Sequence, residues 1–152
     1  MSTPAPPPSE EQIQEELVRL DAYRNQLNAL AQQHAILGTS RQECERARES
    51  LDGIDRSDAS SEYLLPLGGE TFVRGTIVRA SPVLIGIGSG VAVEMERPKA
   101  AELLAQRIGQ IDQAVRDLEG QMRAIDERTQ ILSRRLEAAS RASGGPSGVV
   151  RD

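Results

Sequence analysis

The clearest pattern in the chain is a stripe of apolar residues in its second half. In alternating steps of three and four from Ala101 to Ala139, eleven of twelve positions are apolar, and Thr129 is the exception. An average spacing of 3.5 residues, kept this long, is typical of the buried seam of a coiled coil. Pro98 suits the first turn of a helix, where its missing N–H removes no hydrogen bond. The pattern therefore predicts a coiled-coil helix over residues 98–142.

A second, weaker stripe runs through the first half of the chain. The same stepping from Ile13 to Leu51 meets eight apolar residues in twelve positions. The polar residues that interrupt it are Glu16, His34, Arg41 and Arg48. Ser9 is a good N-cap and Gly53 a plausible stop, so we predict a helix over residues 9–52. A single apolar stripe is not stable when it is exposed to water, and only a short insert separates the two stripes, so we expect the helices to form an antiparallel coiled coil. The polar positions are expected to lower its stability and to help fix its register.

The insert, residues 62–97, has a different composition. It is rich in Val, Ile and Gly, and its short apolar runs are broken by turn residues, which indicates β-strands. The strands are expected at residues 63–67, 71–78, 82–87 and 91–96. The turns need positive backbone angles, which are expected at Gly68 and Gly69 and at Gly88 and Gly90. The predicted fold class is therefore α+β, with two β-hairpins inserted between the helices of a coiled coil.

Two hairpins of this size have little core and leave sheet edges unpaired. We therefore expect hairpins of several chains to close into a β-barrel platform from which the coiled coils project. The residues expected to pack within or between subunits are Leu65, Leu67, Phe72, Val73, Ile77, Val83, Ile85, Ile87, Val91 and Val93. Alternation alone does not tell which of them face a partner chain.

Composition supports an elongated helical chain and narrows the functions. Aromatic residues make up 2% and charged residues 27%, a balance that a compact globular core rarely has. The net charge of -5 argues against nucleic-acid binding. The single cysteine forms no internal disulfide, no apolar run is long enough to span a membrane, and no signal pattern opens the chain, so we expect a cytoplasmic protein. Residues 1–8 and 143–152 are expected to be disordered tails.

Nothing in the sequence favours an enzyme. Gly86, Gly88 and Gly90 are followed by a strand, whereas a nucleotide-binding loop needs a helix there. His34 and Cys44 lie ten residues apart on one helix, so packing is a better explanation for them than a shared metal ion. The carboxylates sit on solvated helix faces, and no nucleophile lies beside a base. We expect no catalytic residue, no cofactor and no metal.

The middle segment resembles a known family. The residues concerned are Tyr63-Leu64-Leu65-Pro66-Leu67-Gly68-Gly69, Thr71-Phe72-Val73 and Ile85-Gly86-Ile87-Gly88-Ser89-Gly90-Val91-Ala92-Val93-Glu94. They resemble the Pro-Leu-Gly turn and the Gly-x-Gly-x-Gly hairpin of the alpha subunit of archaeal prefoldin. With both helices, the resemblance covers nearly the whole chain outside the tails. Beta subunits of that family carry one hairpin, so four strands imply the alpha type.

The resemblance implies an assembly and an activity. Prefoldin is a hexamer of two alpha and four beta subunits, joined by a β platform. Its coiled coils act as an ATP-independent holdase, since their tips bind unfolded polypeptides and the complex passes these to a group II chaperonin. This chain departs from the family in its Pro-rich residues 1–8 at the tip. It also departs from it in Arg41 and Arg48 near the platform, and these two arginines are expected to loosen the coiled coil.

Capture of unfolded polypeptides needs apolar surface that the seam leaves free. Leu17 flanks the seam, and Val18 and Ile131 point away from it near the open tip, although Ile36 also faces outward far from the tip. Seam residues near the tip contribute only where the helix ends fray. These seam residues are Ile13, Leu20, Leu132, Leu136 and Ala139.

Two other functions use the same architecture. The chain would serve as a structural tether if its coiled coils held fixed partners, or as an accessory arm if the β module docked a catalytic subunit. A tether would ignore unrelated denatured proteins, and an accessory arm would co-purify with an enzyme. Neither function explains the sequences of the two hairpins.

Overall fold

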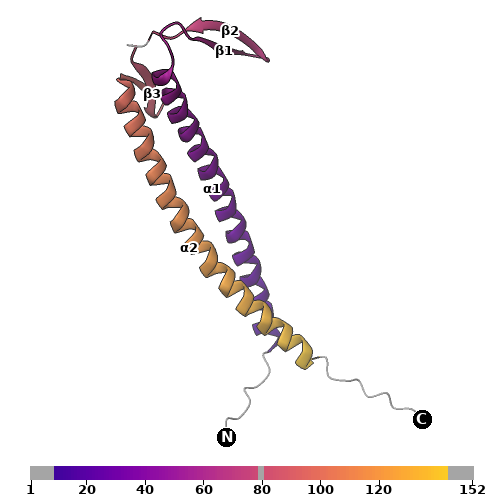
Figure 1. The fold of residues 1–152 in the computed structure, drawn as a ribbon. Coiled ribbons are helices and arrows are strands. Elements are labelled where there is room, and N and C mark those ends of the chain that lie inside the picture. Colours follow the sequence, from indigo (N-terminus) through magenta and orange to yellow (C-terminus); the bar gives the residue numbers. More distant parts are fainter. Residues whose placement is uncertain (1–8, 79–80, 144–152) are drawn as a thin grey trace, which may run out of the picture. The chain divides into compact units, whose positions relative to one another are not determined.

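The computed structural model describes residues 9–78 and 81–143, which form two helices with four strands between them (Figure 1). The elements are α1 (Glu10–Arg56), β1 (Glu62–Gly68), β2 (Thr71–Thr76), β3 (Val83–Gly88), β4 (Val91–Met95) and α2 (Arg97–Ser143). The prediction of two long helices with two antiparallel hairpins is confirmed. The predicted tails lie outside the described residues, except that Ser143 is the last residue of α2.

The chain divides into two compact units. The helical unit contains residues 9–36 of the first helix and 115–143 of the second, and the hairpin unit contains residues 37–114. Both helices are continuous through the two sets of residues.

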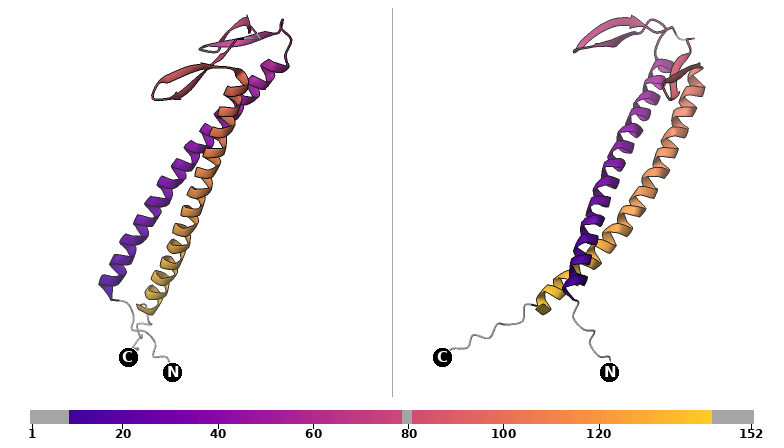
Figure 2. Two further views of the ribbon diagram at one scale, coloured as in Figure 1. Left: turned by 90° about the vertical axis from the view of Figure 1, so that its left-hand side faces the viewer. Right: turned by 180° about the vertical axis from the view of Figure 1, so that it is seen from behind.

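In the helical unit, α1 and α2 lie side by side and run in opposite directions in every view (Figures 1 and 2). Its buried residues are Leu20, Leu118, Ile125, Leu132 and Ala139. All five belong to the predicted stripes, and each large apolar side chain buried in this way stabilises the fold by about 1.5–3 kcal/mol. Only one of them comes from α1, which agrees with its weaker stripe.

Ser9 caps the first turn of α1 in a reciprocal arrangement. The backbone N–H of Gln12 donates to the Ser9 hydroxyl at 3.3 Å, and the backbone N–H of Ser9 donates to the Gln12 side-chain oxygen at 2.9 Å. Two N–H groups that a helix start leaves free are thereby paired. Glu10 and Glu11 add negative charge in the first turn, which the helix dipole favours.

The first helix continues beyond its predicted end. Gly53 does not have a positive φ and sits inside α1, which ends at Arg56. A glycine in a helix interior costs about 1 kcal/mol relative to alanine, and local contacts offset this. The carboxylate of Asp55 pairs with Arg97 at 2.9 Å, and the hydroxyl of Ser57 donates to the carbonyl of Ile54 at 2.8 Å.

The two hairpins are built in the same way. Each is antiparallel and has a two-residue turn in which both residues have positive φ, the signature of a type I′ turn. The turn residues are Gly69 (55°) with Glu70 (59°), and Ser89 (50°) with Gly90 (76°). A glycine of positive φ, Gly68 or Gly88, precedes each turn at an irregularity in the register. The sequence did not predict positive φ at Glu70.

Strand β2 is shorter than predicted. It ends at Thr76, whose partner Glu62 is the first residue of β1. Ile77 and Val78 therefore lie past the end of the partner strand and have no ladder to join. Strands β2 and β4 begin where predicted, and the remaining strand ends differ from the prediction by one residue.

The hairpin unit has a small core where the second hairpin meets the helices. Ile85 of β3 and Ala100 and Leu104 of α2 are buried there. The half-buried residues packed against them are Cys44, Leu51, Val83, Val93, Met95 and Leu103. Val83, Ile85 and Val93 were expected to pack within or between subunits, and they pack within this chain. A side-chain N–H of Arg107 also donates to the carbonyl of Gly86.

Candidate functional site

Apolar side chains are exposed at the end of the helical unit that holds Ser9 and Ser143, which we call the tip. Leu17 is 44% exposed, Val18 65% and Ile131 53%. The seam residues expected to serve only on fraying are buried (Leu20, Leu132, Ala139) or half-buried (Ile13, Leu136). The tip therefore has an accessible apolar set and a second set held in the seam.

Val18 lies in a shallow depression on the outer face of α1. The residues that line it are Glu11, Gln14, Glu15, Val18, Arg19 and Ala22. Glu11, Glu15, Val18 and Ala22 follow the four-three-four spacing of one helix face, so they form a continuous strip. The sequence placed Val18 outside the seam but did not predict this depression.

Exposed apolar residues are not confined to the tip. Ile36 of α1 is 66% exposed, as the helical stripe predicted. It belongs to the helical unit but lies at the end of the unit opposite Ser9. Its exposure equals that of Val18, which makes it a suitable control for the tip.

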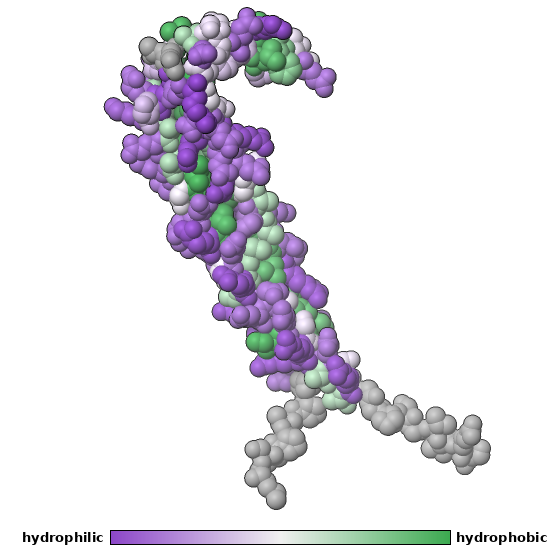
Figure 3. All heavy atoms as spheres, in the orientation of Figure 1, coloured by the Kyte–Doolittle hydropathy of each residue, from purple (hydrophilic) through white to green (hydrophobic). Residues whose placement is uncertain are grey.

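The first hairpin exposes apolar side chains on both faces. Its exposed residues are Leu64, Leu65, Leu67, Phe72 and Val73, and Figure 3 shows hydrophobic surface on this hairpin. Leu65 is paired with Val73 on one face, whereas Leu64 and Phe72 lie on the other. A strand that is apolar on both faces is typical of a sheet covered on both sides.

The second hairpin exposes apolar residues away from its core. Leu84 is 71% exposed, Ile87 52% and Val91 51%. Of the ten residues expected to serve packing or assembly, Leu65, Leu67, Phe72, Val73, Ile87 and Val91 are exposed, Ile77 is half-buried, and three lie in the core described above. Sequence reasoning missed Leu64, Val78 and Leu84, although each of them stands beside a residue that it chose.

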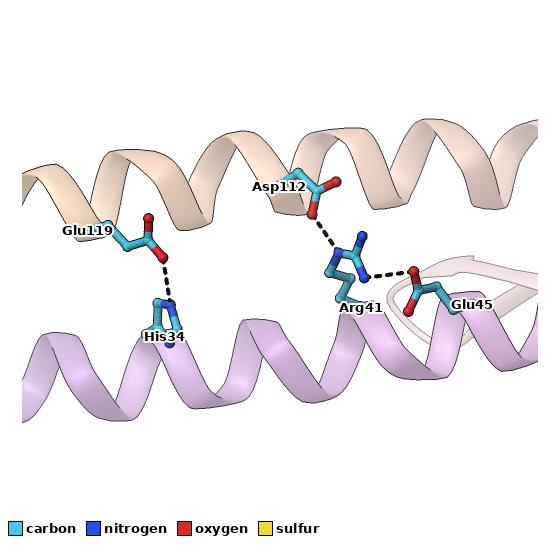
Figure 4. A network of polar contacts seen from close by, with 5 residues as sticks. All are labelled: His34, Arg41, Glu45, Asp112 and Glu119. Carbon is cyan, nitrogen blue, oxygen red and sulfur yellow. Dashed lines mark hydrogen bonds and ion pairs between the residues drawn. The ribbon is translucent and has the colours of Figure 1, made fainter.

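Two polar interruptions of the α1 stripe have acidic partners on α2 (Figure 4). In the helical unit, His34 Nε2 lies 3.4 Å from a carboxylate oxygen of Glu119. In the hairpin unit, Arg41 Nε donates to Asp112 at 2.6 Å, and its Nη1 donates to Glu45 at 2.7 Å. The hydrogen bond from Arg41 to Asp112, reinforced by the nearby carboxylate charges, raises the pKa of the guanidinium above its ordinary value. Arg41, expected to loosen the coiled coil, is held in a bridge between the two helices.

The described residues contain neither a cluster of metal ligands nor a helix that could span a membrane. No three His, Cys, Asp or Glu side chains in residues 9–78 and 81–143 are grouped so that they can hold a metal ion. Across the same residues, neither helix has an apolar stretch that would let it cross a membrane.

Comparison with known proteins identifies the family. Residues 23–142 match the sequence profile described as "Prefoldin subunit". The chain is 30% identical over 132 residues to prefoldin subunit alpha of Methanoculleus marisnigri, covering 87% of this chain and 88% of that protein. It is 26% identical over 127 residues to prefoldin subunit alpha of Pyrococcus horikoshii, covering 83% and 86%.

Solved structures share the fold. A filamentous PFD from Methanocaldococcus jannaschii aligns with a TM-score of 0.67 at 16% identity and covers 80% of this chain and 98% of that chain. The prefoldin beta subunit from Thermococcus strain KS-1 aligns with a TM-score of 0.56 at 20% identity, covering 91% and 96%. The profile match spans well over half of the residues. The chain therefore belongs to the prefoldin family of chaperone subunits, within which it is similar to the archaeal alpha subunits.

Proposed function

We propose that this chain is a cytoplasmic, ATP-independent holdase subunit that binds unfolded polypeptides at its tip and passes them to a group II chaperonin. The observation that carries the proposal is the exposure of Leu17, Val18 and Ile131 at one end of the helical unit. Single exposed apolar residues are ordinary, but several gathered at one end form a surface that unfolded chains recognise.

The helix ends suit clients of varied sequence. Terminal turns open more easily than helix interiors, because fewer packed neighbours hold them. Opening at the tip would release seam residues such as Ile13, Leu136 and Ala139 to join the exposed set. A surface that can enlarge and repack in this way accepts many sequences, as a holdase must.

The two hairpins serve assembly in this proposal. An isolated two-stranded hairpin is marginally stable, and each one here leaves strand edges without partners in its own sheet. Pairing with the hairpins of prefoldin beta subunits would close these edges into a barrel and cover residues such as Leu64 and Phe72. The assembly proposed is a hexamer of two alpha and four beta subunits.

The tip is tested by changing Leu17→Ser, Val18→Ser and Ile131→Ser together. The variant complex is expected to lose most of its ability to suppress aggregation of a chemically denatured client, because the accessible apolar surface is gone. Native mass spectrometry should show an unchanged assembly, since the three residues lie outside the hairpin unit. Addition of a group II chaperonin with ATP should release active client from the wild-type complex.

Ile36→Ser is the matched control, because Ile36 is equally exposed but lies away from the tip. It should leave suppression of aggregation intact. Full suppression by the triple variant would reject the tip as the client site. If the wild-type complex ignored every unrelated denatured protein, a tether with fixed partners would be the better assignment.

A further inference from the structure

Charge at the tip is divided between the two helices. The first turns of α1, residues 9–24, carry Glu10, Glu11, Glu15, Glu16 and Asp21 against Arg19 and Arg24. The last turns of α2, residues 128–143, carry Arg128, Arg134, Arg135 and Arg141 against Glu137. The tip therefore contains an acidic end of α1 and a basic end of α2, each with an exposed apolar residue.

On α1, carboxylates and apolar groups line the same depression. Val18 and Ala22 provide its apolar part, Glu11 and Glu15 provide acidic groups, and Arg19 is its one basic group. Among the described residues, neither Glu11 nor Glu15 has an ion-pair partner. The helix dipole also favours acidic residues near the start of a helix, but it does not explain why an exposed valine lies between them.

On α2, more basic than acidic side chains surround Ile131. Arg128 and Arg135 lie three residues before and four residues after it, and Glu127 lies four residues before it, so all three flank it on the surface of the helix. All three are exposed. The two exposed apolar positions thus differ in the sign of the charge beside them.

We propose that the depression on α1 selects apolar client segments that are flanked by lysine or arginine. An apolar client side chain would rest on Val18 and Ala22 while the flanking cation meets Glu11 or Glu15. This inference rests on the proposed function, because it names the class of client segment that the same tip binds most tightly. The rule is one of charge complementarity at an exposed surface, so it is sensitive to salt.

The test compares three labelled peptides with one apolar core, flanked by lysines, by glutamates or by serines. Their binding to the assembled complex is followed by fluorescence anisotropy. The lysine-flanked peptide should bind most tightly, and Glu11→Gln with Glu15→Gln should weaken it about two- to tenfold, the range for one or two exposed ion pairs. The serine-flanked peptide should be unaffected. The preference should disappear near 1 M salt, where the screening length falls to about 3 Å.

Glu43→Gln with Glu49→Gln is the matched control, because it removes the same charge from exposed positions of α1 in the hairpin unit. An equal loss of affinity in this control would show that net charge alone matters and would overturn the inference. Equal binding of the lysine- and serine-flanked peptides to the wild type would also overturn it.

A further variant separates the inference from the proposed function. If Val18→Ser weakens all three peptides but the acidic residues have no effect, the tip binds clients without charge selection. If no peptide binds at all, both the inference and the proposed function fail. A changed mass of the assembly in Glu11→Gln with Glu15→Gln would show that the depression contacts another subunit, which would also overturn the inference.

Discussion

At the scale of single residues, the interactions of the polar residues in the coiled-coil stripe could not be predicted from the sequence. Spacing identified His34 and Arg41 as interruptions but not their partners, Glu119 and Asp112, which lie 85 and 71 positions away. The register of two helices had to be known before these pairs could be seen. Likewise, the sequence indicated that Ile85 packs within or between subunits. Only its contacts with Ala100 and Leu104 showed that it is buried in the core of its own chain.

The bridge between Arg41 and Asp112 leads to a prediction about single and double substitutions. Arg41→Met should destabilise the chain because it leaves a partly buried carboxylate, 35% exposed, without its cation. Asp112→Leu should also destabilise it, because Arg41 then keeps Glu45 on its own helix but loses its partner on α2. The double variant should recover part of the stability, since both groups that meet across the seam are replaced by apolar ones and the remaining Glu45 is 42% exposed to solvent. Thermal unfolding of the four proteins measures this, and strictly additive losses would contradict it.

The pH dependence of this bridge follows from the direction of the shift. The pKa of Arg41 is raised in the folded chain, so its contribution is fully present below the ordinary arginine value and is lost only as pH rises through the still higher folded value. Arg41 therefore adds no pH dependence to stability near neutrality.

At the scale of elements, the existence of both helices and all four strands could be predicted, but their ends could not. Periodicity reports which face of an element is covered, and it does not report which tertiary contacts extend the element. Beyond Gly53, the first helix makes an ion pair from Asp55 to Arg97, and β2 ends at Thr76, which pairs with the first residue of β1. The end of a helix or strand that depends on contacts with another element cannot be predicted from its own segment of sequence.

The two kinds of glycine in these elements predict opposite effects of one substitution. Gly53→Ala should stabilise the chain by about 0.4–1 kcal/mol, because the site is helical and its Cβ would meet no other atom. Gly90→Ala should destabilise it by about 1–2 kcal/mol, because Gly90 has a φ of 76°, which is strained for alanine. An added Cβ would meet no other atom, so the cost comes from the backbone angle alone. Thermal unfolding of the two variants gives both values, and shifts of the same sign would show that these backbone angles are not the cause.

At the scale of the whole molecule, the surface proposed for assembly was the least predictable part. Both faces of the first hairpin are apolar, so period-two alternation could not separate a face packed on this chain from one left for a partner. The structure shows Val83, Ile85 and Val93 packed internally and Leu64, Leu84 and Phe72 exposed. The tip was more predictable, because a coiled-coil stripe defines its own outer face.

The exposed hairpin surface predicts how the chain behaves with and without partners. Co-expressed with a prefoldin beta subunit, it should give a complex of two and four chains by native mass spectrometry. Expressed alone, it should self-associate, and Leu64→Ser with Phe72→Ser should reduce that association by removing exposed apolar groups. A stable wild-type monomer would argue against assembly through the hairpins.

The antiparallel pairing has a mechanical consequence for the tip. Ser9 and Ser143 belong to the same end of the helical unit, so tension applied through them peels the two helices apart instead of sliding one along the other. The buried layers at Ala139, Leu132 and Ile125 then bear the load one after another. A bound polypeptide that pulls on this end would therefore separate the helices one buried layer at a time.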